Sequence, residues 1–185
     1  MSETLLVPKK INIKTKPYGM GEELFISVEA ENMSEFHQHF SCYVTRELLV
    51  IILEFLERQQ HMHCIFDGDN LICIKNRLPK RILAVDQSQI SSGFEGVPIG
   101  ATLYSTRFRE NFFAYVRVGD WTLSGYTSLY WVEGVIEGIL TKKRLIFNVE
   151  EDKKGRETFK TILDGKTPPA ISTDTKLPHI AYFNE

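Results

Sequence analysis

The sequence predicts an α+β protein with a mainly antiparallel β-sheet built from hairpins. Segments of alternating apolar and polar residues come in neighbouring pairs joined by short turns, which is typical of hairpins. Two other segments carry apolar residues at helical spacing and predict one long buried helix at about 45–60 and a second helix at about 128–141. Strands come first, then a helix, then more strands, an order that favours an antiparallel sheet packed against helices.

The length of 185 residues suits a single globular domain with a substantial core, so one domain is expected over 1–185. Residues 1–21 are rich in lysine and are expected to be a loosely ordered lead-in that ends in a turn at 17–21. Residues 166–185 contain three prolines and are expected to form an extended tail. No internal repeat is visible in the sequence.

The first predicted hairpin joins an alternating segment at 24–30 to a second one at 36–44. In the second segment, one face is apolar and is expected to be buried: Phe36, Phe40, Cys42 and Val44. The opposite face places His37 and His39 side by side, because residues two apart on a strand share a face.

The first predicted helix has the clearer boundary signals. Thr45 can cap its N-terminus, Glu47 suits the positive end of the helix dipole, and Arg58 suits the negative end. In the second helix, Gly134 and Gly138 each weaken the helix by about 1 kcal/mol.

The remaining segments predict further strands and turns. A second hairpin is expected at 64–74, because Asp67-Gly68 lies between two β-rich runs. A strand is expected at 81–85, a loop at 86–100, alternating strands at 101–118 around a turn at 110–111, and a strand at 144–149. The segment 156–163 fits either a helix or a strand.

The charge and cysteine content exclude several classes of protein. The chain has 22 basic and 24 acidic residues and a net charge of −2, which makes nucleic acid an unlikely default partner. Three cysteines argue against a disulfide framework and for a reducing compartment. Because the sequence has no secretory signal pattern and no apolar run near the roughly 20 residues that span a bilayer, a cytoplasmic location without membrane contact is expected.

A cluster of histidines and cysteines is the first candidate for chemistry. His37 and His39 form one H-x-H pair and His61 and His63 form another, so a metal-dependent hydrolase or nuclease that uses all four is an alternative interpretation. The spacing matches neither C-x-x-C nor H-E-x-x-H, and the three cysteines lie in apolar strand patterns that predict packing roles. We therefore expect no catalytic residues, no metal and no cofactor.

The second candidate is an aromatic segment between residues 94 and 131, in which Arg107, Arg109 and Arg117 are interleaved. Aromatic and arginine side chains are enriched at protein-binding hot spots. They also stack on bases, so a single-stranded nucleic-acid-binding module is a further alternative. Packing in a sheet core is the third interpretation of the same residues.

These observations favour a non-enzymatic protein-binding protein. The expected type is a small inhibitor that occludes a partner protein, as bacterial immunity and antitoxin proteins occlude a toxin. The residues expected to bind the partner are the following: Trp121, Tyr126, Tyr130, Arg107 and Arg109. Aromatic anchors would dock on the partner and charged residues would form the rim.

Overall fold

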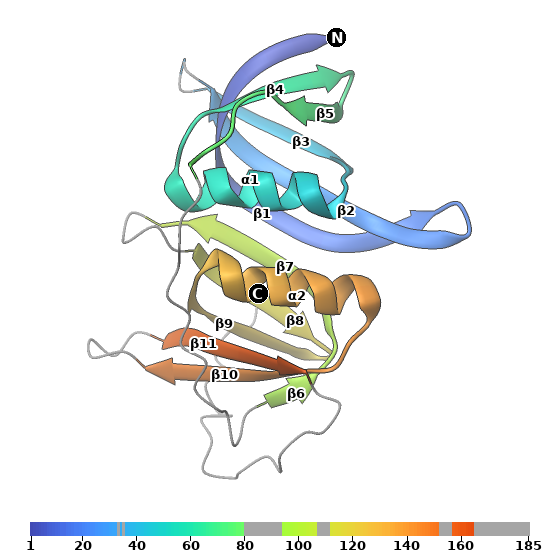
Figure 1. Cartoon of the computed structure of the whole chain (residues 1–185), viewed down its shortest axis with the longest axis vertical. Coiled ribbons are helices and arrows are strands. Elements are labelled where there is room, and N and C mark those ends of the chain that lie inside the picture. The colour runs from blue at the N-terminus through green and yellow to red at the C-terminus, as the bar shows by residue number, and fades with distance from the viewer. Residues whose placement is uncertain (33, 35, 80–93, 107–111, 152–156, 165–185) are drawn as a thin grey trace. The chain divides into compact units, whose positions relative to one another are not determined.

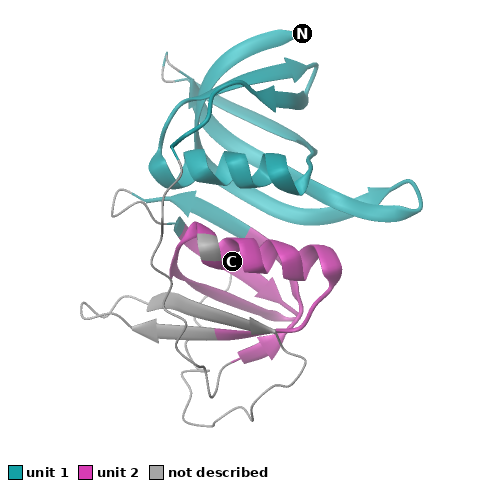
Figure 2. Cartoon of the chain, viewed as in Figure 1, with its two compact units in different colours: residues 1–82, 102–112 teal, residues 83–101, 113–185 magenta. Residues whose placement is uncertain are grey.

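The computed structural model describes residues 1–32, 34, 36–79, 94–106, 112–151 and 157–164. Contacts within the chain gather in two compact units, shown in Figure 2. Unit 1 comprises residues 1–82 and 102–112, and unit 2 comprises residues 83–101 and 113–185. The contacts divide into two sets that each include a sheet and a helix, and the single domain over 1–185 stays a prediction.

Unit 1 contains five strands and one helix (Figure 1). They are β1 (Ser2–Tyr18), β2 (Gly21–Asn32), β3 (His37–Tyr43), α1 (Arg46–Arg58), β4 (Met62–Asp67) and β5 (Asn70–Ile74). The strand order is β3-β2-β1-β4-β5, and every neighbouring pair is antiparallel. It follows that β3 and β5 run parallel, and these two end strands also come close to each other.

The N-terminal segment, which the sequence predicts to be a loosely ordered lead-in, instead forms strand β1. It extends over 17 residues, pairs with β2 from Leu6 to Tyr18, and pairs with β4 from Ser2 to Leu6. Its lysines alternate with Ile11 and Ile13, which are fully buried. From the sequence, the alternation of Ile11 and Ile13 allows only a short edge strand, whereas the 17-residue strand is ordered by partners far away in the chain.

Unit 2 is built mainly from the second half of the chain. Its elements are β6 (Phe94–Gly96), β7 (Pro98–Ser105), β8 (Phe112–Val118), β9 (Trp121–Thr127), α2 (Leu129–Thr141), β10 (Leu145–Glu151) and β11 (Glu157–Asp164); β7 and β8 also contribute residues to unit 1. The strand order is β7-β8-β9-β11-β10-β6, with β9 and β11 parallel. Because one residue separates β6 from β7, the two ends of this order are consecutive in the chain and the sheet closes into a barrel.

The two units share one connectivity, although the sequence shows no repeat. When β6 and β7 are counted as one bent strand, each unit has three strands, a helix and two strands. In each, the third and fifth strands run in the same direction and the fourth lies beside the first. This cyclic order is that of the OB-fold, a five-stranded Greek-key barrel. The connectivity describes the fold and does not by itself assign a function.

Both predicted helices are present, but neither is long. α1 and α2 each have 13 residues, so the expected single long buried helix is not confirmed. The Thr45 side chain caps α1 by accepting a hydrogen bond from the Leu48 backbone N–H, and the face of α1 toward the sheet is buried. In α2, a Cβ at Gly138 would lie 2.8 Å from the side chains of Leu145 and Pro98. A larger residue at this position would therefore clash with both side chains.

The hairpin of β2 and β3 confirms the predicted faces. Phe40, Cys42 and Val44 are buried, and His37 and His39 are exposed. Phe36 departs from the expectation: it lies before β3 and is 69% exposed. Because Phe36 lies outside the paired strand, the alternation that buries Phe40, Cys42 and Val44 does not extend to it.

The later segments give mixed outcomes. The hairpin at 64–74 is confirmed as β4 and β5, and the ambiguous segment at 156–163 lies in β11, a strand. Part of the expected loop at 86–100 instead forms β6 and the start of β7. The strand expected at 81–85, the turn expected at 110–111 and the tail at 166–185 lie outside the described residues. Among the residues that are described, no helix is long and apolar enough to cross a membrane.

Candidate functional site

The aromatic segment runs from β6 into α2, and its residues belong to unit 2 except for 102–112, which belong to unit 1. Trp121, the first residue of β9, is 45% exposed, and its ring meets the ring of Phe94 edge to face with centroids 6.1 Å apart. A large aromatic side chain with nearly half its surface in solvent can bury that surface on a partner.

A second aromatic group lies on one face of β8 and β9. The Phe113 ring meets Tyr115 at 5.2 Å and Tyr126 at 5.0 Å between centroids, in both cases edge to face. All three side chains are half-buried. Arg117 follows on the same face of β8 because it is two residues beyond Tyr115, and it is exposed.

The five predicted partner-binding residues are not assembled at one point among the described residues. Trp121 and Tyr126 are five apart on one strand, so they belong to opposite faces of β9. Tyr130 lies in α2, but its side chain is outside what the structure describes. Arg107 and Arg109 fall in the gap at 107–111.

The four histidines of the alternative metal interpretation lie on different strands. His37 and His39 are on β3, opposite Glu31 and Glu29 of β2, whereas His61 precedes β4 and His63 lies within it. Among the residues that the structure describes, no three His, Cys, Asp or Glu side chains lie close enough to hold a metal ion.

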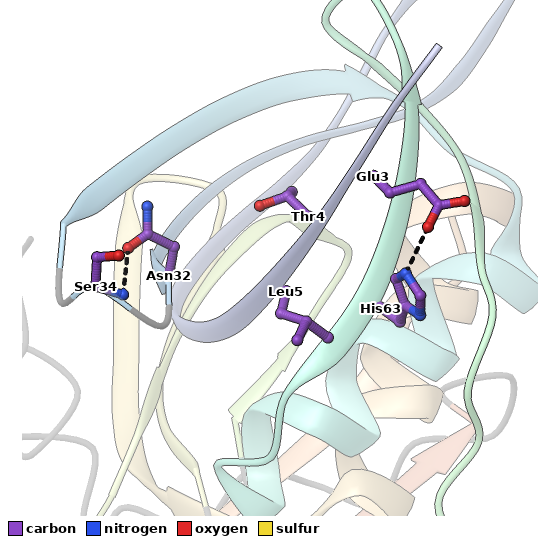
Figure 3. A pocket seen from close by; sticks show the side chains of 6 residues that line it. All are labelled: Glu3, Thr4, Leu5, Asn32, Ser34 and His63. Carbon is purple, nitrogen blue, oxygen red and sulfur yellow. Dashed lines mark hydrogen bonds and ion pairs between the residues drawn. The ribbon is translucent and has the colours of Figure 1, made fainter.

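His63 belongs instead to a cluster with Glu3 and Lys75, and of these Glu3 and His63 line a groove, shown in Figure 3. Its Nε2 lies 3.0 Å from Glu3 Oε2, and Lys75 Nζ lies 2.7 Å from Glu3 Oε1. Lys75 first and His63 second hold the pKa of the Glu3 carboxyl below its ordinary value of 4.5. The groove has a volume of about 440 Å³ and is lined by Glu3, Thr4, Leu5, Asn32, Ser34 and His63.

This cluster joins residues that no pattern in the sequence groups. Glu3 and His63 are 60 positions apart, and Lys75 is farther still. Both carboxylate oxygens of Glu3 already accept a hydrogen bond from a neighbouring side chain, so the cluster ties the start of β1 to β4. Its arrangement is that of a structural charge pair on the surface.

The cysteines correct one part of the sequence interpretation. Cys42 and Cys64 are buried, as packing residues should be, but Cys73 is exposed. The register shift between β4 and β5 at Ile65/Phe66 interrupts the alternation, so Ile72 and Cys73 are both exposed. Burial raises the pKa of the Cys64 thiol to about 12, which removes it as a nucleophile.

Comparisons with known proteins supply no relative for this arrangement. No family model matches the chain, no curated protein matches it, and no solved structure matches it.

Proposed function

We propose that this chain is a non-enzymatic protein-binding protein, and that Trp121 is the anchor of its binding surface. The observation that carries the proposal is the 45% exposure of Trp121 beside Phe94. Tryptophan is the residue type most enriched at the energetic centres of protein interfaces, because it buries a large area with few rotatable bonds.

The charge on β8 and β9 favours a protein partner for this segment over nucleic acid. Arg117 is the one charged side chain in the fourteen residues of these two strands. Nucleic-acid binding depends on neutralising several phosphates with lysine or arginine. A protein surface has no such requirement, and the apolar centre of a protein interface is depleted of charge.

The mode of action proposed is occlusion, as in inhibitors of the immunity or antitoxin type. The partner would be covered by the surface around Trp121, and no bond would be made or broken. Tyr126, Tyr130, Arg107 and Arg109 stay in the proposal as further contacts predicted from sequence.

Photo-crosslinking tests the proposal. A photoreactive phenylalanine analogue placed at position 121 should crosslink to one partner protein in the source cells. The matched control places the analogue at Ile99, which is 49% exposed and also in unit 2. Equal crosslinking from both positions, or from neither, contradicts the proposal.

A further inference from the structure

The β1–β2 hairpin of unit 1 and the end of the neighbouring strand β3 carry a second group of exposed apolar side chains. Tyr18 is 61% exposed, Tyr43 is 37% exposed, and Met20 at the turn is fully exposed. β3 ends where Tyr43 pairs with Phe25, but β1 and β2 stay paired as far as Tyr18 and Gly21. The hairpin therefore runs past the end of β3, as Figure 1 shows.

One face of this hairpin combines aromatic rings with lysines. Alternation places Lys14, Lys16 and Tyr18 on the same face of β1. Phe25 is directly opposite Lys14, and Tyr43 is directly opposite Phe25, so all five share that face. We call these five residues the hairpin patch: Lys14, Lys16, Tyr18, Phe25 and Tyr43.

Contacts within the hairpin patch fix its shape. The Tyr43 ring meets Tyr18 at 5.0 Å and Phe25 at 5.1 Å between centroids. The Tyr43 hydroxyl donates a hydrogen bond of 2.8 Å to the Pro17 carbonyl, and Lys16 Nζ stands 3.8 Å above the Phe25 ring centre. Side chains held in this way lose little freedom when a ligand binds.

The local charge of the hairpin patch differs from that of the whole chain. Lys14 and Lys16 lie within it, and Lys9 and Lys10 continue along β1. Two carboxylates share this face, Glu23 opposite Lys16 and Glu29 opposite Lys10, whereas Glu22 lies on the other face beside Thr15. Lys9 has Glu31 of β2 within 4.0 Å, so the positive charge of the hairpin patch comes from Lys14 and Lys16.

We propose that the hairpin patch binds single-stranded nucleic acid. Tyr18 and Tyr43 would stack on unpaired bases, and Lys14 and Lys16 would contact the adjoining phosphates, a combination that holds single strands without sequence preference. This site is in unit 1 and shares no residue with the surface around Trp121, so it is independent of the proposed function.

Fluorescence anisotropy with the full chain tests this proposal. The probes are fluorescein-labelled dT20 and U20 in about 50 mM salt. Binding is expected, with a log–log salt slope of about −1.4, because two phosphate contacts on a single strand release about 0.7 counterion each. Tyr18→Ala should weaken binding roughly 5- to 150-fold, the loss of one stacked base.

Two controls separate the possible outcomes. Lys14→Ala/Lys16→Ala should weaken binding, whereas Lys14→Arg/Lys16→Arg should retain it. Trp121→Ala, which removes an exposed aromatic side chain in unit 2, should leave oligonucleotide affinity unchanged even though it weakens binding of the proposed protein partner. No anisotropy change up to about 100 µM protein overturns the proposal. Equal affinity for double-stranded DNA with no effect of Tyr18→Ala also overturns it, because such binding would rest on charge alone.

Discussion

His63 on β4 and Glu3 on β1 lie 3.0 Å apart although 60 positions separate them in the chain. Lys75 donates a hydrogen bond to the other oxygen of the Glu3 carboxylate. The three side chains together connect the first residues of β1 to the neighbouring strands. The contact between Glu3 and His63 supports the pairing of Ser2–Leu6 with β4.

The Glu3 cluster predicts a pH-dependent contribution to stability. The folded state lowers the pKa of Glu3, so the contribution is present above the unfolded value near 4.5 and is lost as pH falls through the lower folded value. Glu3→Gln should therefore be less stable than wild type in urea unfolding at pH 7, and the difference should be smaller at pH 3 than at pH 7. Asp69→Asn, in an exposed turn, is the control. A Glu3→Gln deficit of equal size at both pH values would contradict the cluster's role.

Thiol reactivity should separate the three cysteines. Cys73 is exposed, whereas Cys42 and Cys64 are buried and burial raises the pKa of both thiols. Ellman's reagent at pH 8 should titrate one thiol in the native protein and three in denaturant. Cys73→Ser should abolish the native reaction, and a second fast thiol in that variant would show that one of the buried pair is accessible.

The two helix N-termini should respond differently to loss of the cap residue. The Thr45 side chain accepts a hydrogen bond from the Leu48 backbone N–H, whereas Ser128 makes no such bond at the start of α2. Thr45→Ala should cost about 1 kcal/mol of unfolding free energy, since one helix N–H loses its acceptor. Thr45→Ser should be close to wild type. Ser128→Ala is the matched control, and an equal loss there would argue against a capping effect.

Gly96 should be intolerant of a side chain. A Cβ at this position would lie 2.3 Å from Val118 Cγ1, which brings β6 against the end of β8. Gly96→Ala should destabilise the protein by about 1–3 kcal/mol, the usual effect of overpacking. In a double-mutant cycle, Val118→Ala should recover part of that loss. Strict additivity of the two changes would mean that the residues are not in contact.

Local patterns in the sequence are enough to predict several elements. The cap at Thr45, the alternation that buries Phe40 and Cys42, and the turn at Asp67-Gly68 all rest on residues close together in the chain. An alternating strand face and a helix N-terminal cap are each defined by residues close together in the chain. Such features can therefore be predicted from a single sequence.

Features that depend on distant partners are not readable in this way. β1 is ordered by β2 and β4, and the shared barrel connectivity depends on the parallel contact between β9 and β11. Trp121 and Tyr126 look like one aromatic site in the sequence, but their odd spacing on β9 places them on opposite faces. The hairpin patch was hidden because its five residues come from three strands.

The affinity of the partner identified by crosslinking at position 121 tests the central claim most directly. Isothermal titration of that purified partner with wild type and Trp121→Ala should show at least about 30-fold weaker binding for the variant, the loss typical of an interface anchor. Tyr18→Ala should bind the partner as wild type does. An unchanged dissociation constant for Trp121→Ala would contradict the account.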